Sequence, residues 1–172
     1  MSATHVIGVD PGLEGAMVHL DHLRQVRSFA KTPVVRSSSN SGGKTQYNER
    51  EMAEVLQGMV RAAQAEGALV KVAVEDVHAA PGQGVVSMFR FGYGYGLWCG
   101  IVAQLGVPLV RIRPQAWQRL AYAGRDSSDK KQASILVARE KWPALPLRSK
   151  SADSGVSDAA LLAWAVSVSM PA

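Results

Sequence analysis

Short apolar runs and longer amphipathic stretches alternate along the chain. Runs typical of β-strands cover residues 5–10, 15–21, 25–30, 68–76 and 107–113, and the first of them ends in the turn sequence Asp-Pro-Gly. Strands that first follow one another and later alternate with helices predict an α/β domain with a mixed sheet. We therefore expect a mixed five-stranded sheet flanked by helices.

Apolar residues three and four positions apart predict the helices. The clearest pattern covers residues 48–66, where Met52, Leu56 and Met59 share one side and Asn48 can cap the first turn. Similar patterns predict further helices at residues 86–105, 114–122, 128–141 and 157–169.

One stretch lacks any apolar face. Residues 36–44 read RSSSNSGGK, which favours an exposed loop, and we expect a flexible loop at about residues 36–47. With that loop inside it, the chain is expected to form a single domain over residues 1–172.

Composition narrows the class of protein. Apolar residues make up 47% of the 172 residues and charged residues 19%, which excludes a disordered chain or a coiled coil. The single cysteine, Cys99, cannot form an internal disulfide or a multi-thiolate metal site. No signal peptide and no apolar run of membrane-spanning length is visible, so we expect no membrane partner and a cytoplasmic location.

Positive charge is concentrated in one part of the chain. The net charge is +5, yet residues 111–150 alone contain ten basic residues against three acidic ones. Clustered cations favour polyanions because DNA binding releases counterions, although a solvated basic surface has the same composition. The candidate DNA contacts here are Arg111, Arg113, Arg125, Lys131, Arg148 and Lys150.

Three carboxylates lie at the ends of apolar runs. Asp10 and Glu75 each follow a predicted strand, and Asp158 begins the last apolar helix. If the two strands are neighbours, the acids converge, and hard oxygen ligands of this kind suit Mg²⁺ or Mn²⁺. Each acid alone has a structural alternative, as a turn residue, a strand end or a helix N-terminal residue.

Asp153 is a candidate fourth acid. It precedes Asp158 by five residues, a spacing that does not place both side chains on one face of a continuous helix. The two can meet only if the helix begins between them, with Ser154 or Ser157 as its cap.

The acidic segments resemble those of a known nuclease family. IGVDPGLEGA (7–16), VAVEDV (72–77) and SDAALLAWA (157–165) are similar to the acidic motifs of RuvC-type Holliday junction resolvases, which have the ribonuclease H-like fold. Residues 81–118, PGQGVVSMFRFGYGYGLWCGIVAQLGVPLVRIRPQAWQ, resemble the chloroplast branch of these resolvases.

The resemblance implies a metal site. It makes Asp10, Glu75, Asp153 and Asp158 the catalytic ligands of two Mg²⁺ ions, with Mn²⁺ as a possible substitute. The chloroplast branch has a histidine in place of Ser154, which leaves the fourth ligand open. Lys130 matches the lysine-bearing segment near the cleavage site, and Lys131 is the alternative, with ordinary phosphate contact as the simpler role for both.

The segment after Glu75 is a candidate for reading DNA. Gln83 has an amide able to contact a base edge, and Phe89 and Phe91 can stack on unpaired bases. The alternative for the two phenylalanines is packing in the core, which is also the simplest role for Trp117.

Together these features imply a Holliday junction resolvase, a metal-dependent endodeoxyribonuclease that makes paired symmetric nicks in four-way DNA junctions. Paired nicks need two active sites, so a homodimer is expected, with the apolar helix at 96–106 as a candidate interface. The alternatives are another ribonuclease H-like nuclease that cuts RNA–DNA hybrids, forks or flaps, and a non-catalytic junction-binding protein. The sequence does not identify a branch-migration partner.

Overall fold

A mixed five-stranded sheet forms the centre of the computed structural model, which describes residues 3–37, 44–78, 82–125 and 127–169. The strand order is β3-β2-β1-β6-β7. β1 pairs antiparallel with β2 and parallel with β6, while β2–β3 is antiparallel and β6–β7 parallel. The strands are β1 (Thr4–Asp10), β2 (Ala16–Leu20), β3 (Val26–Lys31), β6 (Leu69–Glu75) and β7 (Leu109–Ile112).

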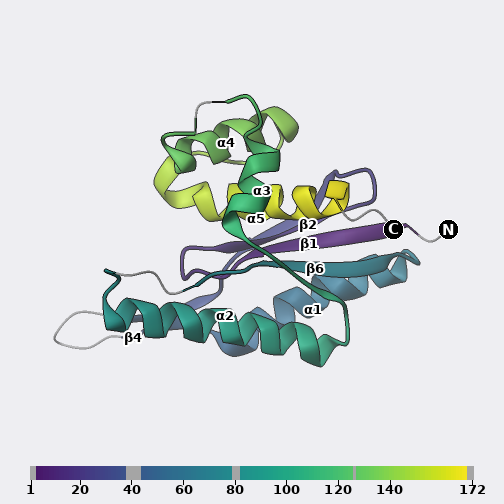
Figure 1. The fold of residues 1–172 in the computed structure, drawn as a ribbon. Helices are drawn as coiled ribbons and strands as arrows, with labels where there is room; N and C mark the ends of the chain where they lie inside the picture. The colour runs from purple at the N-terminus through teal and green to yellow at the C-terminus, as the bar shows by residue number, and fades with distance from the viewer. Residues whose placement is uncertain (1–2, 38–43, 79–81, 126, 170–172) are drawn as a thin grey trace.

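Helices cover both faces of this sheet (Figure 1). One face carries α1 (Glu49–Ala65) and α2 (Val85–Leu105). The other carries α5 (Lys150–Ser169) directly on β1 and β2, with α3 (Pro114–Ala121) and α4 (Lys130–Lys141) packed against α5. The predicted α/β fold with a mixed five-stranded sheet is confirmed.

The alternation of side chains along β1 explains the two layers. Val6 packs into the core under α5, and Ile7 into the core under α1 and α2. Gly8 faces α5 so closely that a Cβ atom there would overlap the carbonyl oxygen of Ala159. This contact sets α5 across β1, next to the strand end that carries Asp10.

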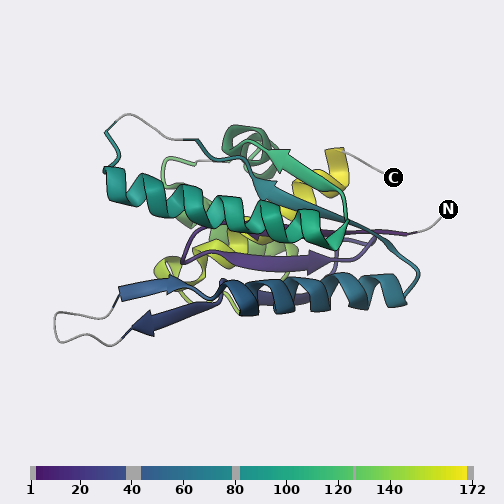
Figure 2. The ribbon, with the colours of Figure 1, turned by 90° about the horizontal axis from the view of Figure 1, so that it is seen from below.

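The expected loop at about 36–47 overlaps two short strands. Strands β4 (Val34–Ser37) and β5 (Lys44–Tyr47) pair only with each other, and residues 38–43 lie outside the described residues. Figure 2 shows this hairpin extending beyond the main sheet at the end where α2 begins. Tyr47 is buried, and its packing holds β5 in place. The polar composition of the segment does not predict this contact.

The last helix also begins earlier than predicted. α5 starts at Lys150 rather than near 157, because Ser149 caps it: the Ser149 Oγ accepts the Ala152 N–H at 3.1 Å. No helix within the described ranges is both long and apolar enough to cross a bilayer.

Candidate active site

Two neighbouring parallel strands bring Asp10 and Glu75 to the same sheet edge. The register pairs Val9 with Val74, and each acid is the next residue along its strand. Ala73, two residues before Glu75, faces the α5 layer, so the alternation turns Glu75, like Asp10, toward α5. Asp158 lies in the third turn of α5, which crosses these strands.

The charges of neighbouring carboxylates act on Glu75 and Asp158. Burial raises the pKa of Glu75 to about 7, and the charge of Asp10 adds to that shift. Burial likewise raises the pKa of Asp158 to about 7, with further increases from Asp10 and Glu75. The pKa of Asp10 is raised by burial too. These effects indicate that Asp10, Glu75 and Asp158 lie close together.

Two side chains that the sequence did not mark as functional hold the cluster in place. The Trp117 indole Nε1–H donates to Glu75 Oε1 at 2.8 Å, and the Ser134 hydroxyl donates to Asp158 Oδ1. The sequence predicts Trp117 only as a core or interface residue, and Ser134 carries no sequence signal because its contact forms between α4 and α5. Both residues are almost fully buried, so they hold the two carboxylates from the side of the protein core.

Ser134 is itself supported by α5. Its Oγ lies 2.7 Å from Ser157 Oγ, and the Ser157 hydroxyl donates to the Ser154 carbonyl at 2.8 Å. Since Ser134 donates its single proton to Asp158 and Ser157 donates its own to Ser154, the Ser134–Ser157 approach is a close packing contact that fixes the position of Ser134.

Lys130 and Lys131 provide positive charge beside the cluster. Both are exposed residues at the start of α4. The charge of Lys130 acts to lower the pKa of Glu75, and that of Lys131 acts to lower the pKa of both Asp10 and Asp158. The two lysines thus act on different carboxylates of the same site.

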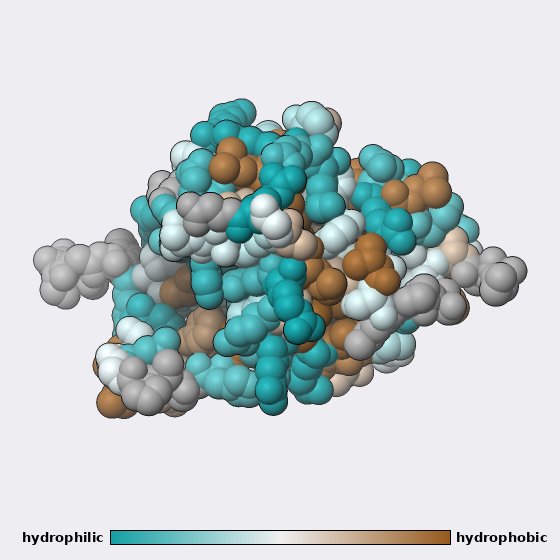
Figure 3. All heavy atoms as spheres, turned by 45° about the horizontal axis from the view of Figure 1, so that its top comes forward, coloured by the Kyte–Doolittle hydropathy of each residue, from teal (hydrophilic) through white to brown (hydrophobic). Residues whose placement is uncertain are grey.

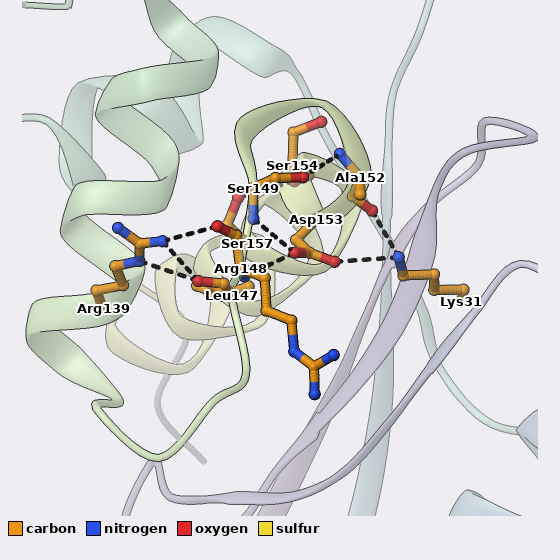
Figure 4. A network of polar contacts seen from close by, with 9 residues as sticks. All are labelled: Lys31, Arg139, Leu147, Arg148, Ser149, Ala152, Asp153, Ser154 and Ser157. Atoms are coloured by element: carbon orange, nitrogen blue, oxygen red, sulfur yellow. Dashed lines mark hydrogen bonds and ion pairs between the residues drawn. The ribbon is translucent and has the colours of Figure 1, made fainter.

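Asp153 is not brought together with the three acids. Because α5 is continuous from Lys150, the five-residue step to Asp158 turns the two side chains about 140° apart around the helix. Figure 4 shows the Asp153 carboxylate pointing toward Lys31 and the backbone before α5.

Its carboxylate has a complete set of other partners. Asp153 pairs with Lys31 Nζ at 3.0 Å and accepts the N–H groups of Arg148 and Ser149 at 2.7 and 2.9 Å. The Ser149 N–H, foremost, holds its pKa below the usual range. Arg139 secures the same segment by donating to the Leu147 carbonyl at 2.6 Å (Figure 4).

The donor atoms of the cluster suit a hard divalent cation, since all three acids are oxygen donors and the ionised forms of Glu75 and Asp158 are destabilised by the charge of neighbouring acids. Among the described residues, however, no group of three His, Cys, Asp or Glu side chains is arranged so that it can hold a metal ion as it stands.

The candidate DNA-contacting cations differ in what they contact. Arg111 donates to the Tyr95 hydroxyl at 3.0 Å, and Arg125 pairs with both carboxylate oxygens of Glu140 at 2.6 and 2.8 Å. Arg113 and Arg148 are exposed. The side chain of Lys150 lies outside the described set. On the side of α3 and α4, hydrophilic residues predominate and apolar ones form separate small patches (Figure 3).

Gln83, Phe89 and Phe91 lie at the start of α2 but not on one side of it. Phe89 is 78% exposed. Phe91 is half-buried and lines a small cavity of about 130 Å³ together with Gln83 and Tyr95. Only Phe89 presents its ring fully to solvent.

Comparison with known proteins supports the fold. No protein-family model matches the chain, and no curated protein matches it. Among solved structures, the chain is similar to Thermus thermophilus RuvC, with 17% identity, a TM-score of 0.49, and coverage of 94% of this chain and 92% of that one. It is also similar to Thermus thermophilus RuvC in complex with a Holliday junction substrate, with 18% identity, a TM-score of 0.55, and coverage of 98% and 96%.

Neither match is a chloroplast protein, so the likeness of residues 81–118 to the chloroplast branch gains no support from these comparisons. What the second match shows is the architecture: this chain has the α/β, ribonuclease H-like fold of RuvC.

Proposed function

We propose that this protein is a Holliday junction resolvase, a metal-dependent endodeoxyribonuclease that makes paired symmetric nicks in four-way DNA junctions. The observation that carries the proposal is the convergence of Asp10, Glu75 and Asp158 at one end of the sheet. The choice of substrate rests on the fold shared with a RuvC that was solved with a Holliday junction substrate, and on the motifs near the three acids.

Asp10, Glu75 and Asp158 are the residues that would hold Mg²⁺, with Mn²⁺ as a substitute. When bound, a pair of such ions supplies Lewis acidity at the attacking and leaving oxygens of a phosphodiester. The raised pKa values of Glu75 and Asp158 mean that ionised carboxylates are costly here without a cation, so the acids favour its binding.

The other residues of the site position these ligands and the phosphate. Trp117 fixes one oxygen of Glu75, and Ser134 fixes one oxygen of Asp158. Lys130 is the candidate catalytic lysine, placed to stabilise negative charge on the phosphate, and Lys131 contacts DNA beside it. Arg113, Arg148 and Gln83 extend this contact surface.

We leave Asp153 out of the metal-binding set. Its carboxylate would have to release Lys31 and two backbone N–H groups to reach the cluster, and it lies on another side of α5. Its role in this proposal is to order the segment that carries Arg148.

We further propose a homodimer formed through α2. Gly92, Gly96 and Gly100 are exposed at four-residue intervals, with open space where a Cβ would lie. They border a groove of about 600 Å³ between α1 and α2 that also contains Leu97 and Ile101. A helix face this smooth permits close approach of a second copy, and two copies supply the two active sites that paired nicks need.

The dimer is tested by sedimentation of Gly96→Gln. The bulky polar side chain has room in one copy but blocks close helix packing, so the variant should sediment as a monomer. Gly58→Gln is the matched control, because Gly58 is an exposed helical glycine on α1 with equally open surroundings. If Gly96→Gln remains a dimer, α2 is not the interface.

The activity is tested by incubating the protein with labelled four-way junction, linear duplex, fork and RNA–DNA hybrid, with Mg²⁺ and with EDTA. Paired nicks in the junction, lost in EDTA, are expected. Preferential cutting of the hybrid or fork would favour another nuclease of this fold. Tight junction binding with no cutting would favour a non-catalytic binding protein.

A further inference from the structure

The β4–β5 hairpin is fixed against the start of α2 by Tyr47. The tyrosine is 3% exposed, and its hydroxyl donates to the Pro11 carbonyl at 3.2 Å. Its ring lies so close to α2 that a Cβ atom on Gly94 would overlap it. The base of the hairpin therefore has a defined position relative to both α2 and β1.

A cleft of about 310 Å³ lies between the hairpin and α2. Thr45 and Gln46 of β5 line one wall, while Val86, Phe89 and Tyr93 of α2 line the other. Val86 is 71% exposed and Phe89 78% exposed. Large apolar side chains gathered at a cleft and left in water mark a binding surface.

Cations border the same cleft. Lys44 from β5 and Arg90 from α2 are lining residues. The one acid among the lining residues, Glu49, accepts a hydrogen bond from the Tyr93 hydroxyl at 2.7 Å. An aromatic ring with cations beside it suits single-stranded nucleic acid, where bases stack on the ring and phosphates meet the cations.

The cleft is connected through Tyr47 to the end of β1 that carries Asp10. Tyr47 forms part of its lining, and Pro11, which accepts the Tyr47 hydroxyl, directly follows Asp10. The charge of Asp10 adds to the effect of burial in raising the pKa of Tyr47 to about 12, which also indicates that the two are near neighbours. The cleft therefore borders the end of β1 that carries Asp10.

We propose that the cleft between β5 and α2 binds one unstacked nucleobase of the DNA strand, with Phe89 as the stacking surface and Lys44 and Arg90 at the flanking phosphates. The inference rests on the proposed nuclease function, since it assigns the cleft to the same DNA. The volume is at the lower end of the range for ligand pockets, about 300 to 1,000 Å³, which suits one base and not a stacked pair.

The test measures binding of ten-nucleotide single strands by fluorescence anisotropy in EDTA, where no cleavage occurs. One probe is oligodeoxythymidylate, and the other is an abasic strand of equal length and charge. The wild type should bind the base-bearing strand about 5- to 100-fold more tightly. Phe89→Ala should lose most of that preference, and Phe89→Trp should keep it.

Phe29→Ala is the matched control, because Phe29 is an exposed phenylalanine, 39% accessible, on β3. It should keep the wild-type preference for bases. Three results would overturn the inference: no base preference in the wild type, an equal loss of affinity for both strands in Phe89→Ala, or conversion of Phe89→Ala to a monomer, which would make the cleft part of a subunit interface.

Junction cleavage is measured separately with the same samples. Cleavage without any base preference contradicts the base-binding cleft alone. Base preference without junction cleavage contradicts the proposed resolvase activity alone.

Discussion

Trp117→Phe separates a positioning role for the indole from a purely structural one. The substitution removes the Nε1–H that donates to Glu75 at 2.8 Å and leaves most of a buried aromatic ring in place. That hydrogen bond opposes the rise of the Glu75 pKa caused by burial, so its loss should raise the pKa further.

The magnitude follows from the energy of one hydrogen bond to a charged group. Such a bond contributes about 1.5–3 kcal/mol, and 1.36 kcal/mol corresponds to one pKa unit, so the loss amounts to about 1–2 pH units. Because metal ligation needs the ionised carboxylate, the midpoint of the pH–rate profile should move up by that amount. Since about half of Glu75 is ionised at pH 7 in the wild type, the cleavage rate there should fall about 5- to 50-fold, with recovery at higher pH.

The assay is single-turnover cleavage of a four-way junction from pH 5.5 to 9.5 at fixed, limiting Mg²⁺. Trp142→Phe is the matched control, since Trp142 is a buried tryptophan of the same core whose Nε1 donates at 2.8 Å to the Arg24 carbonyl, away from the site. It should lose comparable stability with an unchanged pH midpoint. An equal loss of rate at every pH in Trp117→Phe, with the midpoint unmoved, would refute the positioning role.

Three further predictions follow from the same geometry. The folded-state pKa of Glu75 is raised to about 7, so its contribution to stability is fully present below its unfolded pKa and is lost as the pH rises from there through about 7. In EDTA, Glu75→Gln should therefore exceed the wild type in unfolding free energy by about 3 kcal/mol at pH 8 and by little at pH 4, and equal differences at both pH values would contradict this. Asp153→Asn should retain cleavage within about tenfold, whereas Asp158→Asn should abolish it, because removing a ligand costs far more than weakening a partly exposed ion pair; abolition by both would return Asp153 to the metal set. Gly94→Ala should destabilise the fold by about 1–3 kcal/mol because its Cβ overlaps the buried Tyr47, whereas Gly92→Ala, with open space at its Cβ, should be neutral or stabilising in thermal unfolding.

The strands and the main acids could be predicted because their signals are local. An apolar run that ends in a carboxylate predicts both a strand and the position of its acid, as at Asp10 and Glu75. The pairing of β1 with β6 then brings the two acids to one edge, as the sequence argument required.

The missed features depend on contacts between distant segments. Trp117 and Ser134 lie 42 and 24 residues from their carboxylate partners, and nothing in their neighbouring residues indicates those hydrogen bonds. Asp153 shows a related difficulty. The apolar pattern that starts near 157 predicts that the helix begins there. In the structure a polar first turn, capped by Ser149, lets the helix begin before Asp153, so the Asp153 side chain lies on a different side of the helix from Asp158.

The hairpin differs from its predicted loop for the same physical reason. Its residues are mostly polar, and its order comes from Tyr47, which packs against Gly94 of a helix far along the chain. The composition of the segment cannot predict a contact with a residue so far along the chain.

The most direct test of the shared carboxylate site compares the wild type with Glu75→Gln on one labelled four-way junction, measuring cleavage in Mg²⁺ and binding in the same buffer with Ca²⁺ in place of Mg²⁺. The three-acid site predicts paired nicks by the wild type, no detectable cleavage by Glu75→Gln, and junction affinity within about threefold, because DNA binding depends chiefly on the basic residues. Cleavage by Glu75→Gln at the wild-type rate would contradict the central claim.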